Sequence, residues 1–113
     1  MAKVIFRRGD FVVAAAPGSY GKPRPALVVQ SDLFSALPSV TLCPITSMIR
    51  NDADLLRITV EPSETSGLKE FCQIIIDKIT TLPIEKVGKV IGRADDALMI
   101  RVNRALATFL EIA

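Results

Sequence analysis

Arg24 stands between two prolines, in the segment Lys22-Pro23-Arg24-Pro25, just before the apolar run 26–29. A residue that precedes proline is driven into extended geometry, and each proline fixes its own φ angle and lacks an N–H. The sequence therefore predicts a guanidinium on a stiff, extended backbone at the entrance to a buried strand. Because this group is always charged and its planar fork matches a phosphate, we predict an anion-handling site. An ion pair with a carboxylate at the rim of a barrel is the alternative, and both stay open at this point.

The length and composition of the chain are those of one globular domain, over residues 1–113. Half of the residues are hydrophobic and 23% are charged, which is not the composition of a disordered chain. The net charge of +2 permits contact with a polyanion but is weaker than that of a dedicated duplex binder. No apolar run approaches the roughly 18 residues of a membrane span, and residues 1–8 do not read as a signal peptide. We therefore expect a cytoplasmic protein that contacts no membrane.

The chain has no histidine and two cysteines. The absence of histidine removes Ser-His and Cys-His nucleophile pairs, histidine acid–base pairs and most catalytic zinc sites. Any catalysis must then use arginine, hydroxyl groups, carboxylates and backbone dipoles, and we expect neither a metal nor a cofactor. Cys43 and Cys72 lie inside apolar runs, where a thiol packs as a small hydrophobe. Core packing is therefore favoured over a disulfide or a reactive thiol.

Short strand-like runs dominate the chain and are separated by turn-rich stretches. Turns rich in Gly, Pro and Ser fall at 17–21, 38–39 and 61–67. Short strands at this spacing predict a mainly β fold, built as a small, strongly bent sheet or barrel. The expected strands cover residues 11–15, 26–30, 40–45, 56–60, 71–76 and 87–91.

The chain closes on a predicted helix that begins after Asp95. Asp95 is a suitable N-cap, and Asp96 places negative charge in the first turn. An apolar stripe at helical spacing predicts that this helix packs against the sheet. The stripe consists of Leu98, Val102, Leu106, Phe109 and Leu110.

An ordered set of short motifs runs through nearly the whole chain. The pieces are Arg8-Gly9-Asp10, the proline-flanked segment 22–29, Cys43-Pro44-Ile45-Thr46-Ser47, residues 73–79, Val90-Ile91-Gly92-Arg93 and residues 101–106. This set resembles the MazF/PemK family of toxin ribonucleases, in the order of the family, which makes it more specific than any one piece.

The resemblance implies an SH3-like small β-barrel of the CcdB/MazF type with a C-terminal helix, usually assembled as a homodimer. It also implies the toxin of a type II toxin–antitoxin system. Such a toxin is an endoribonuclease (an mRNA interferase) that cuts single-stranded RNA without metal and is held inactive by a cognate antitoxin. Members of the family use the arginine of an Arg-Pro-Ala/Val motif and the threonine that ends the third strand. By position, these catalytic residues are Arg24 and Thr46.

The chemistry of RNA self-cleavage suits these two residues. The 2′-hydroxyl attacks the adjacent phosphorus in line, which gives a 2′,3′-cyclic phosphate and a free 5′-hydroxyl. Alignment lowers the barrier, and so do donors aimed at the charge that grows on the phosphoryl oxygens. Arg24 can supply two parallel charged hydrogen bonds, and the Thr46 hydroxyl can bond a phosphate oxygen or the attacking 2′-oxygen. Ser47 is a weaker candidate of the same kind, and on spacing alone Thr46 is an ordinary β-branched strand end.

The groups that transfer protons are not assigned by the sequence. Arginine stays protonated in proteins and is a poor general base. Asp77 falls at the acidic position of the family after the fifth predicted strand, where it could accept a proton or bind a base edge. Some relatives carry an arginine two residues before that aspartate, where this chain has Ile75. The acidic residue common in the first loop of the family is also missing from residues 17–22.

The glycine-rich loop at 17–22 is expected to close over a strand of RNA. Ser19 is a candidate substrate contact in this loop, Tyr20 could stack on a base, and Lys22 could neutralise a phosphate. Lys78, which follows the candidate acid Asp77, is a further candidate for a phosphate contact. The alternative for the loop is an ordinary solvent-exposed turn.

Two non-catalytic functions on the same fold stay open. One is a CcdB-like toxin that poisons DNA gyrase through its terminal helix, which would need neither Arg24 nor Thr46. The other is a degenerate relative that only binds RNA or an antitoxin peptide, which the missing acid–base residues would explain.

Overall fold

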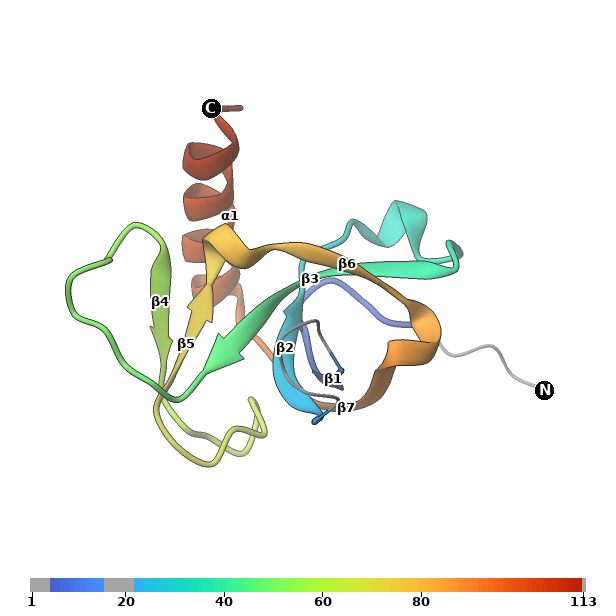
Figure 1. The fold of residues 1–113 in the computed structure, drawn as a ribbon, viewed down its shortest axis with the longest axis horizontal. Helices are drawn as coiled ribbons and strands as arrows, with labels where there is room; N and C mark the ends of the chain where they lie inside the picture. Colours follow the sequence, from blue (N-terminus) through green and yellow to red (C-terminus); the bar gives the residue numbers. More distant parts are fainter. Residues whose placement is uncertain (1–4, 16–21, 113) are drawn as a thin grey trace.

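The computed structural model describes residues 5–15 and 22–112, and β-strands dominate this part of the chain (Figure 1). The strands are β1 (Asp10–Ala14), β2 (Arg24–Val28), β3 (Ser39–Thr46), β4 (Arg57–Val60), β5 (Cys72–Ile75), β6 (Thr80–Pro83) and β7 (Val87–Arg93). The helices are three short 3-10 turns, η1 (Asp32–Phe34), η2 (Ile76–Lys78) and η3 (Ile84–Lys86), and one long helix, α1 (Asp96–Leu110).

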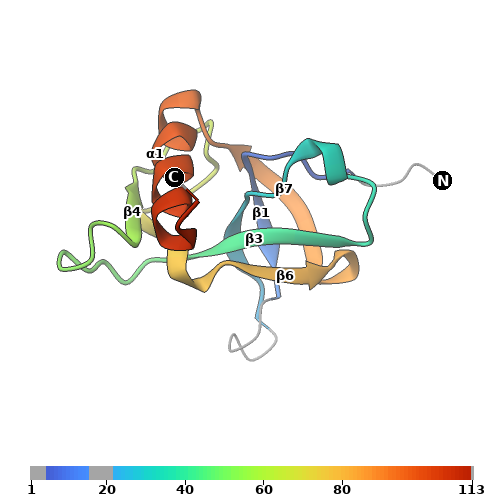
Figure 2. The ribbon, with the colours of Figure 1, turned by 90° about the horizontal axis from the view of Figure 1, so that it is seen from above.

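The strands pair antiparallel throughout, and β3 takes part in two sections of the sheet. The order is β4-β5-β3-β2-β1-β7, with β6 paired to β3 off this path. β6 pairs with β3 as far as Leu42, whereas β5 pairs with Ile45 and Thr46 at the end of the same strand. Pro44 lies between these two ladders, at a position where a residue without an N–H is tolerated. Figure 2 shows β3 as the long strand that runs past both sections.

Alternating side chains on the shared strands build two hydrophobic cores. Ala26 and Leu42 point into the barrel-like section, which β1, β2, β3, β6 and β7 surround. Their chain neighbours Leu27 and Cys43 point the other way, into a second core that β4, β5 and α1 complete. Successive residues of a strand face opposite sides, so one strand can supply both cores. The mainly β, barrel-like architecture expected from the sequence is confirmed.

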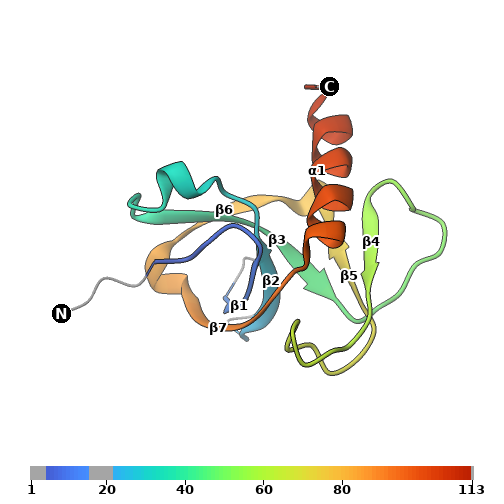
Figure 3. The ribbon, with the colours of Figure 1, turned by 180° about the vertical axis from the view of Figure 1, so that it is seen from behind.

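α1 begins after Asp95 as predicted and packs against the sheet, but its C-terminal turn does not pack against the sheet. The side chain of Asp95 accepts a hydrogen bond from Leu98 N at 2.8 Å and caps the helix. Val102 is buried in the second core, whereas Phe109 and Leu110 are 43% and 48% exposed. The helix rises past the ends of the strands (Figures 1 and 3), so its last turn has no sheet beneath it. The prediction that these two residues belong to the packed stripe was wrong.

Several strand bounds differ from the prediction, and β2 begins and ends two residues earlier than expected. β6 was not predicted, because its four residues end in a proline and their apolar pattern is too short to distinguish from a turn. β7 continues through Gly92 to Arg93, two residues beyond the predicted end. Phe71 was predicted inside a nearly buried strand, but it precedes β5 and is 54% exposed.

Two glycines allow the loop at 61–67 to lie in backbone contact with β7. A Cβ atom at Gly92 would overlap the carbonyl oxygen of Ser66, and one at Gly67 would overlap that of Ile91. Gly67 also has a φ of +71°, in the region that residues with a Cβ atom rarely adopt. The loop therefore lies closer to β7 than a residue with a Cβ atom at either position would allow.

We predict that Gly92→Ala lowers the free energy of unfolding by about 3 kcal/mol, the upper range for overpacking, because the loop must move away from β7. Urea unfolding followed by circular dichroism would measure this change. Gly88→Ala is the matched control within β7, since its Cβ would come no closer than 3.2 Å to Val13 O. Equal losses of stability in the two variants would contradict the proposed overlap.

Candidate active site

Arg24 is the first residue of β2, and its side chain is exposed. Ala26 pairs with Pro44 of β3, and the same antiparallel register carried two residues further sets Arg24 opposite Thr46. Residues that stand opposite each other in antiparallel strands point to the same face of the sheet. The register therefore brings the two predicted catalytic residues to one face, just beyond the hydrogen-bonded ladder.

The Arg24 guanidinium makes no ion pair with a carboxylate in the described part of the chain. The ion pairs there join Arg50 to Asp52 and Arg93 to Asp10. The undescribed residues, 1–4, 16–21 and 113, include no Asp or Glu. Within the described ranges, Arg24 therefore has no carboxylate partner for the rim ion pair that the sequence left open.

Thr46 ends β3 and is half-buried, and its hydroxyl already has one defined partner. Met48 N–H donates to Thr46 Oγ1 at 3.1 Å, in a tight turn that starts the connection to β4. A hydroxyl can accept and donate at once, so this bond leaves the Thr46 O–H hydrogen available to a ligand. Ser47, the weaker candidate, follows directly and is exposed.

Gln73 is a polar residue of this site that sequence reasoning missed. It lies in β5 directly opposite Thr46 and is only 3% exposed. Arg50 N–H donates to Gln73 Oε1 at 3.0 Å, and Gln73 Nε2 donates back to Arg50 O at 2.9 Å. This reciprocal pair holds the segment after Thr46 against the sheet. An amide inside an otherwise apolar strand was the signal that could have identified it, because buried amides need partners.

One row of polar side chains crosses four neighbouring strands at this end of the sheet. Thr46 pairs with Gln73, and Gln73 pairs with Thr59 of β4, whose Oγ1 is 3.2 Å from Gln73 Nε2. The register of β2 adds Arg24 at the other end of the row. The opposite face of the same strands carries buried residues such as Ile74 and packs on α1. The row therefore lies on the face that the helix leaves uncovered.

The remaining predicted residues lie around this row or outside the described ranges. Asp77 and Lys78 are both exposed on η2, the turn that follows β5. The pKa of Arg50 is raised chiefly by its hydrogen bond to Asp52, and Asp77 adds a smaller electrostatic contribution. Asp77 is therefore close enough to Arg50, whose backbone Gln73 holds, to influence its charge. Lys22 is exposed just before β2, whereas Ser19 and Tyr20 lie outside the described residues.

Residues 7–110 match the family described as the PemK-like, MazF-like toxin of type II toxin–antitoxin systems. The chain belongs to this family. It is 47% identical over 108 residues to the probable endoribonuclease MazF of Mycolicibacterium smegmatis, a match that covers 95% of this chain and 98% of the relative. The resemblance seen in the sequence motifs is thereby confirmed.

Solved structures share this fold at lower identity. An endoribonuclease in complex with its cognate antitoxin, from a mycobacterial species, is 24% identical with a TM-score of 0.78, over 96% of this chain and 97% of its own. A chain of a MazE–MazF crystal structure from Deinococcus radiodurans is 19% identical with a TM-score of 0.75, over 96% of this chain and 98% of its own. These likenesses support the barrel-like fold of this MazF-family chain.

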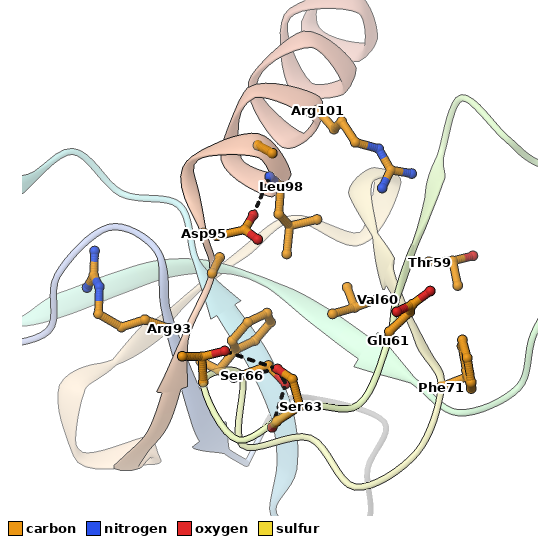
Figure 4. Close-up of a pocket in the computed structure, with 14 residues that line it drawn as sticks. Thr59, Val60, Glu61, Ser63, Ser66, Phe71, Arg93, Asp95, Leu98 and Arg101 are labelled. Atoms are coloured by element: carbon orange, nitrogen blue, oxygen red, sulfur yellow. Dashed lines mark hydrogen bonds between the residues drawn. The ribbon is translucent and has the colours of Figure 1, made fainter.

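A pocket of about 540 Å³ lies between β4, the loop at 61–66 and the first turns of α1 (Figure 4). Arg101 and Glu61 reach toward it from the helix and the loop, and Phe71 forms part of its wall. Neither Arg24 nor Thr46 lines this pocket. The expected catalytic pair, Arg24 and Thr46, therefore lies outside this pocket.

Neither a metal cluster nor a membrane span occurs among residues 5–15 and 22–112. No three of their His, Cys, Asp and Glu side chains gather closely enough to hold a metal ion. No helix among them is long and apolar enough to cross a membrane. Cleavage without metal stays a prediction from the family resemblance.

Both cysteines are free and buried, which confirms their predicted place in the core. Burial raises the pKa of Cys43 to about 12, although the nearby charge of Arg8 opposes part of the rise. Burial also raises the pKa of Cys72, with a further contribution from Glu70. Because the thiolate is the reactive form, both thiols should be inert at neutral pH.

We predict that the folded protein does not react with a chromogenic disulfide reagent at pH 7.5, whereas two thiols react after denaturation. Absorbance of the released thiolate would follow the reaction. Rapid release of one equivalent from the native protein would show that a cysteine is accessible and would contradict this prediction.

We predict that Gln73→Ala lowers the free energy of unfolding by about 1–3 kcal/mol, because the buried amide loses its partners on Arg50 and Thr59. Hydrogen exchange at the Arg50 amide should also become faster, since its acceptor is removed. Gln30→Ala is a matched control, because Gln30 likewise bonds backbone groups, at Phe34, Ser39 and Thr41. Unchanged exchange at Arg50 in the Gln73 variant would contradict the proposed role.

Proposed function

We propose that this chain is the toxin of a type II toxin–antitoxin system and cuts single-stranded RNA as a metal-independent endoribonuclease. The observation that carries the proposal is the placement of Arg24 and Thr46 on one face, with no described carboxylate paired to the guanidinium. The relative from Mycolicibacterium smegmatis is named a probable endoribonuclease MazF, which supports the same activity.

In the proposed reaction, the 2′-oxygen attacks the adjacent phosphorus and the bond to the 5′-oxygen breaks. The products are a 2′,3′-cyclic phosphate and a 5′-hydroxyl. Arg24 holds the phosphoryl oxygens with two charged N–H groups and stabilises the charge that builds on them. Thr46 donates its hydroxyl hydrogen to a phosphate oxygen or to the 2′-oxygen, which aligns the attack.

A second group must move the protons, because Arg24 stays protonated and cannot act as a base. The proton leaves the 2′-hydroxyl as the new P–O bond forms, and the departing 5′-oxygen takes one up. We assign the acceptor role to Asp77, which is exposed on η2 and lies close enough to Arg50 to influence its charge. Ile75 is aliphatic, so no proton transfer is assigned to that position.

The assembly and partners of the chain belong to the same proposal. Solved relatives include an endoribonuclease bound to its cognate antitoxin and MazE–MazF structures, which supports an antitoxin partner here. We further propose a homodimer that acts in the cytoplasm, where mRNA is translated. A single domain over residues 1–113 accounts for the matched family region at 7–110.

We predict that the purified chain cleaves single-stranded RNA in the presence of EDTA, and that Arg24→Ala lowers the cleavage rate at least about 10²–10³-fold. Thr46→Val, which keeps the shape and removes the hydroxyl, should lower the rate in the same direction. Thr46→Ser is its matched control, since it keeps the hydroxyl. Gel analysis of the RNA and sequencing of its cut ends would measure both rate and end chemistry.

Each competing function gives a different outcome in this experiment. Intact RNA at high protein concentration, with RNA still bound, would favour the degenerate binding protein. Toxicity in cells that survives Arg24→Ala but is lost on changes in α1 would favour a CcdB-like gyrase poison. Circular dichroism of each variant would show whether the fold is retained.

A further inference from the structure

Arg57 places a second guanidinium on the face that carries the polar row. It is the first residue of β4 and stands directly opposite Ile75 of β5. Two residues further along the same strand, Thr59 stands opposite Gln73. Because residues two apart on a strand share a face, Arg57 points to the same side as Thr59 and Gln73.

The segment after Thr46 fixes the direction of this side chain. Arg57 Nη1 donates to the carbonyl oxygen of Met48 at 3.3 Å, and Arg57 is partly buried. Met48 is two residues beyond Thr46 and is anchored on both sides, by its own bond to Thr46 and by the clamp of Gln73 on Arg50. The guanidinium is therefore held over the connection that leaves the candidate catalytic threonine.

In the described part of the chain, Arg57 makes no ion pair. Its neighbour Asp52 is bound by Arg50 through two hydrogen bonds, of 3.1 and 3.0 Å. The pKa of Asp52 is lowered mainly by its hydrogen bond to Arg50, with a smaller contribution from the charge of Arg57. A guanidinium has five N–H donors, and the bond to Met48 uses one, so the others remain for an anion.

The spacing of the strands suits a polymer of phosphates. Two strand spacings of about 4.8 Å separate β4 from β3, so Arg57 starts about 10 Å or more from Thr46. Arg24, which is proposed to hold the phosphate that is cut, stands one strand further away, on β2. This separation is suited to a neighbouring phosphate of a strand laid across the row from Arg24 toward β4.

We propose that Arg57 is a further RNA-binding residue, which contacts a phosphate flanking the one that is cut. This inference rests on the proposed function for the identity of the polymer. Arg57 supplies a cation on the sheet face beside Ile75, where its bond to Met48 directs the guanidinium. Its contact is made equally before and during the reaction, so it contributes to substrate binding and not to the chemical step.

The test is binding of a fluorescein-labelled, fully 2′-O-methylated single-stranded RNA, which lacks the attacking hydroxyl and cannot be cut. Arg57→Gln keeps a donor for Met48 and removes the charge, whereas Arg57→Lys keeps the charge. We expect the glutamine variant to bind about tenfold more weakly, with the slope of log affinity against log salt reduced by about 0.7. The lysine variant should keep the wild-type slope.

Arg104→Gln is the matched control, because Arg104 is exposed on α1, which covers the opposite face of the sheet. It should change neither affinity nor slope. Equal binding by Arg57→Gln and Arg104→Gln would overturn the inference. Thermal unfolding of both variants would verify that the fold is unchanged.

Cleavage kinetics separate this inference from the proposed function. On cleavable RNA, Arg57→Gln should raise KM with kcat retained, whereas Arg24→Ala should lower kcat. If the wild type cuts RNA and Arg57→Gln has unchanged KM, the inference fails and the nuclease function stands. If the wild type binds RNA without cutting it and Arg57→Gln weakens that binding, the nuclease function fails and the role of Arg57 stands.

Discussion

Antiparallel pairing with β3 is the constraint on which the candidate site depends. The ladder with β5 sets Thr46 opposite Gln73, and the register with β2 directs Arg24 to the same face. The paired residues of the two ladders set this register, and a slip by one position would turn every side chain to the other face. Backbone pairing therefore determines where the residues of the site lie. Their polar side chains then supply the charge and the hydrogen-bonding groups at those positions.

The buried amide of Gln73 connects this geometry to the irregular segment after Thr46. A polar group inside a sheet is costly unless its donors and acceptors are satisfied, and here the Arg50 backbone and Thr59 satisfy it. The same bonds restrict the conformations of a connection that would otherwise be held only at its ends. Stability and the arrangement of charged groups are thus maintained by one set of contacts.

Features set by local chemistry were predictable from the sequence. The two prolines around Arg24 indicated its extended backbone, and Asp95 indicated where α1 begins. Gln73 and Arg57 acquire their significance from strands far apart in the chain, and periodicity carries no information on which strands pair. The exposed turn at Phe109 was missed for a similar reason, because a helical stripe does not reveal how far the sheet beneath it extends.

The division of β2 and β3 between two cores has a consequence for how the molecule comes apart. Alternate residues of these strands, such as Leu42 and Cys43, belong to different cores, so loosening one core frees the wall of the other. The chain should therefore melt as a single cooperative unit, without a partly ordered form that keeps half of the sheet. The polar row needs β2, β3, β5 and β4 together, so it is complete only when both cores are formed.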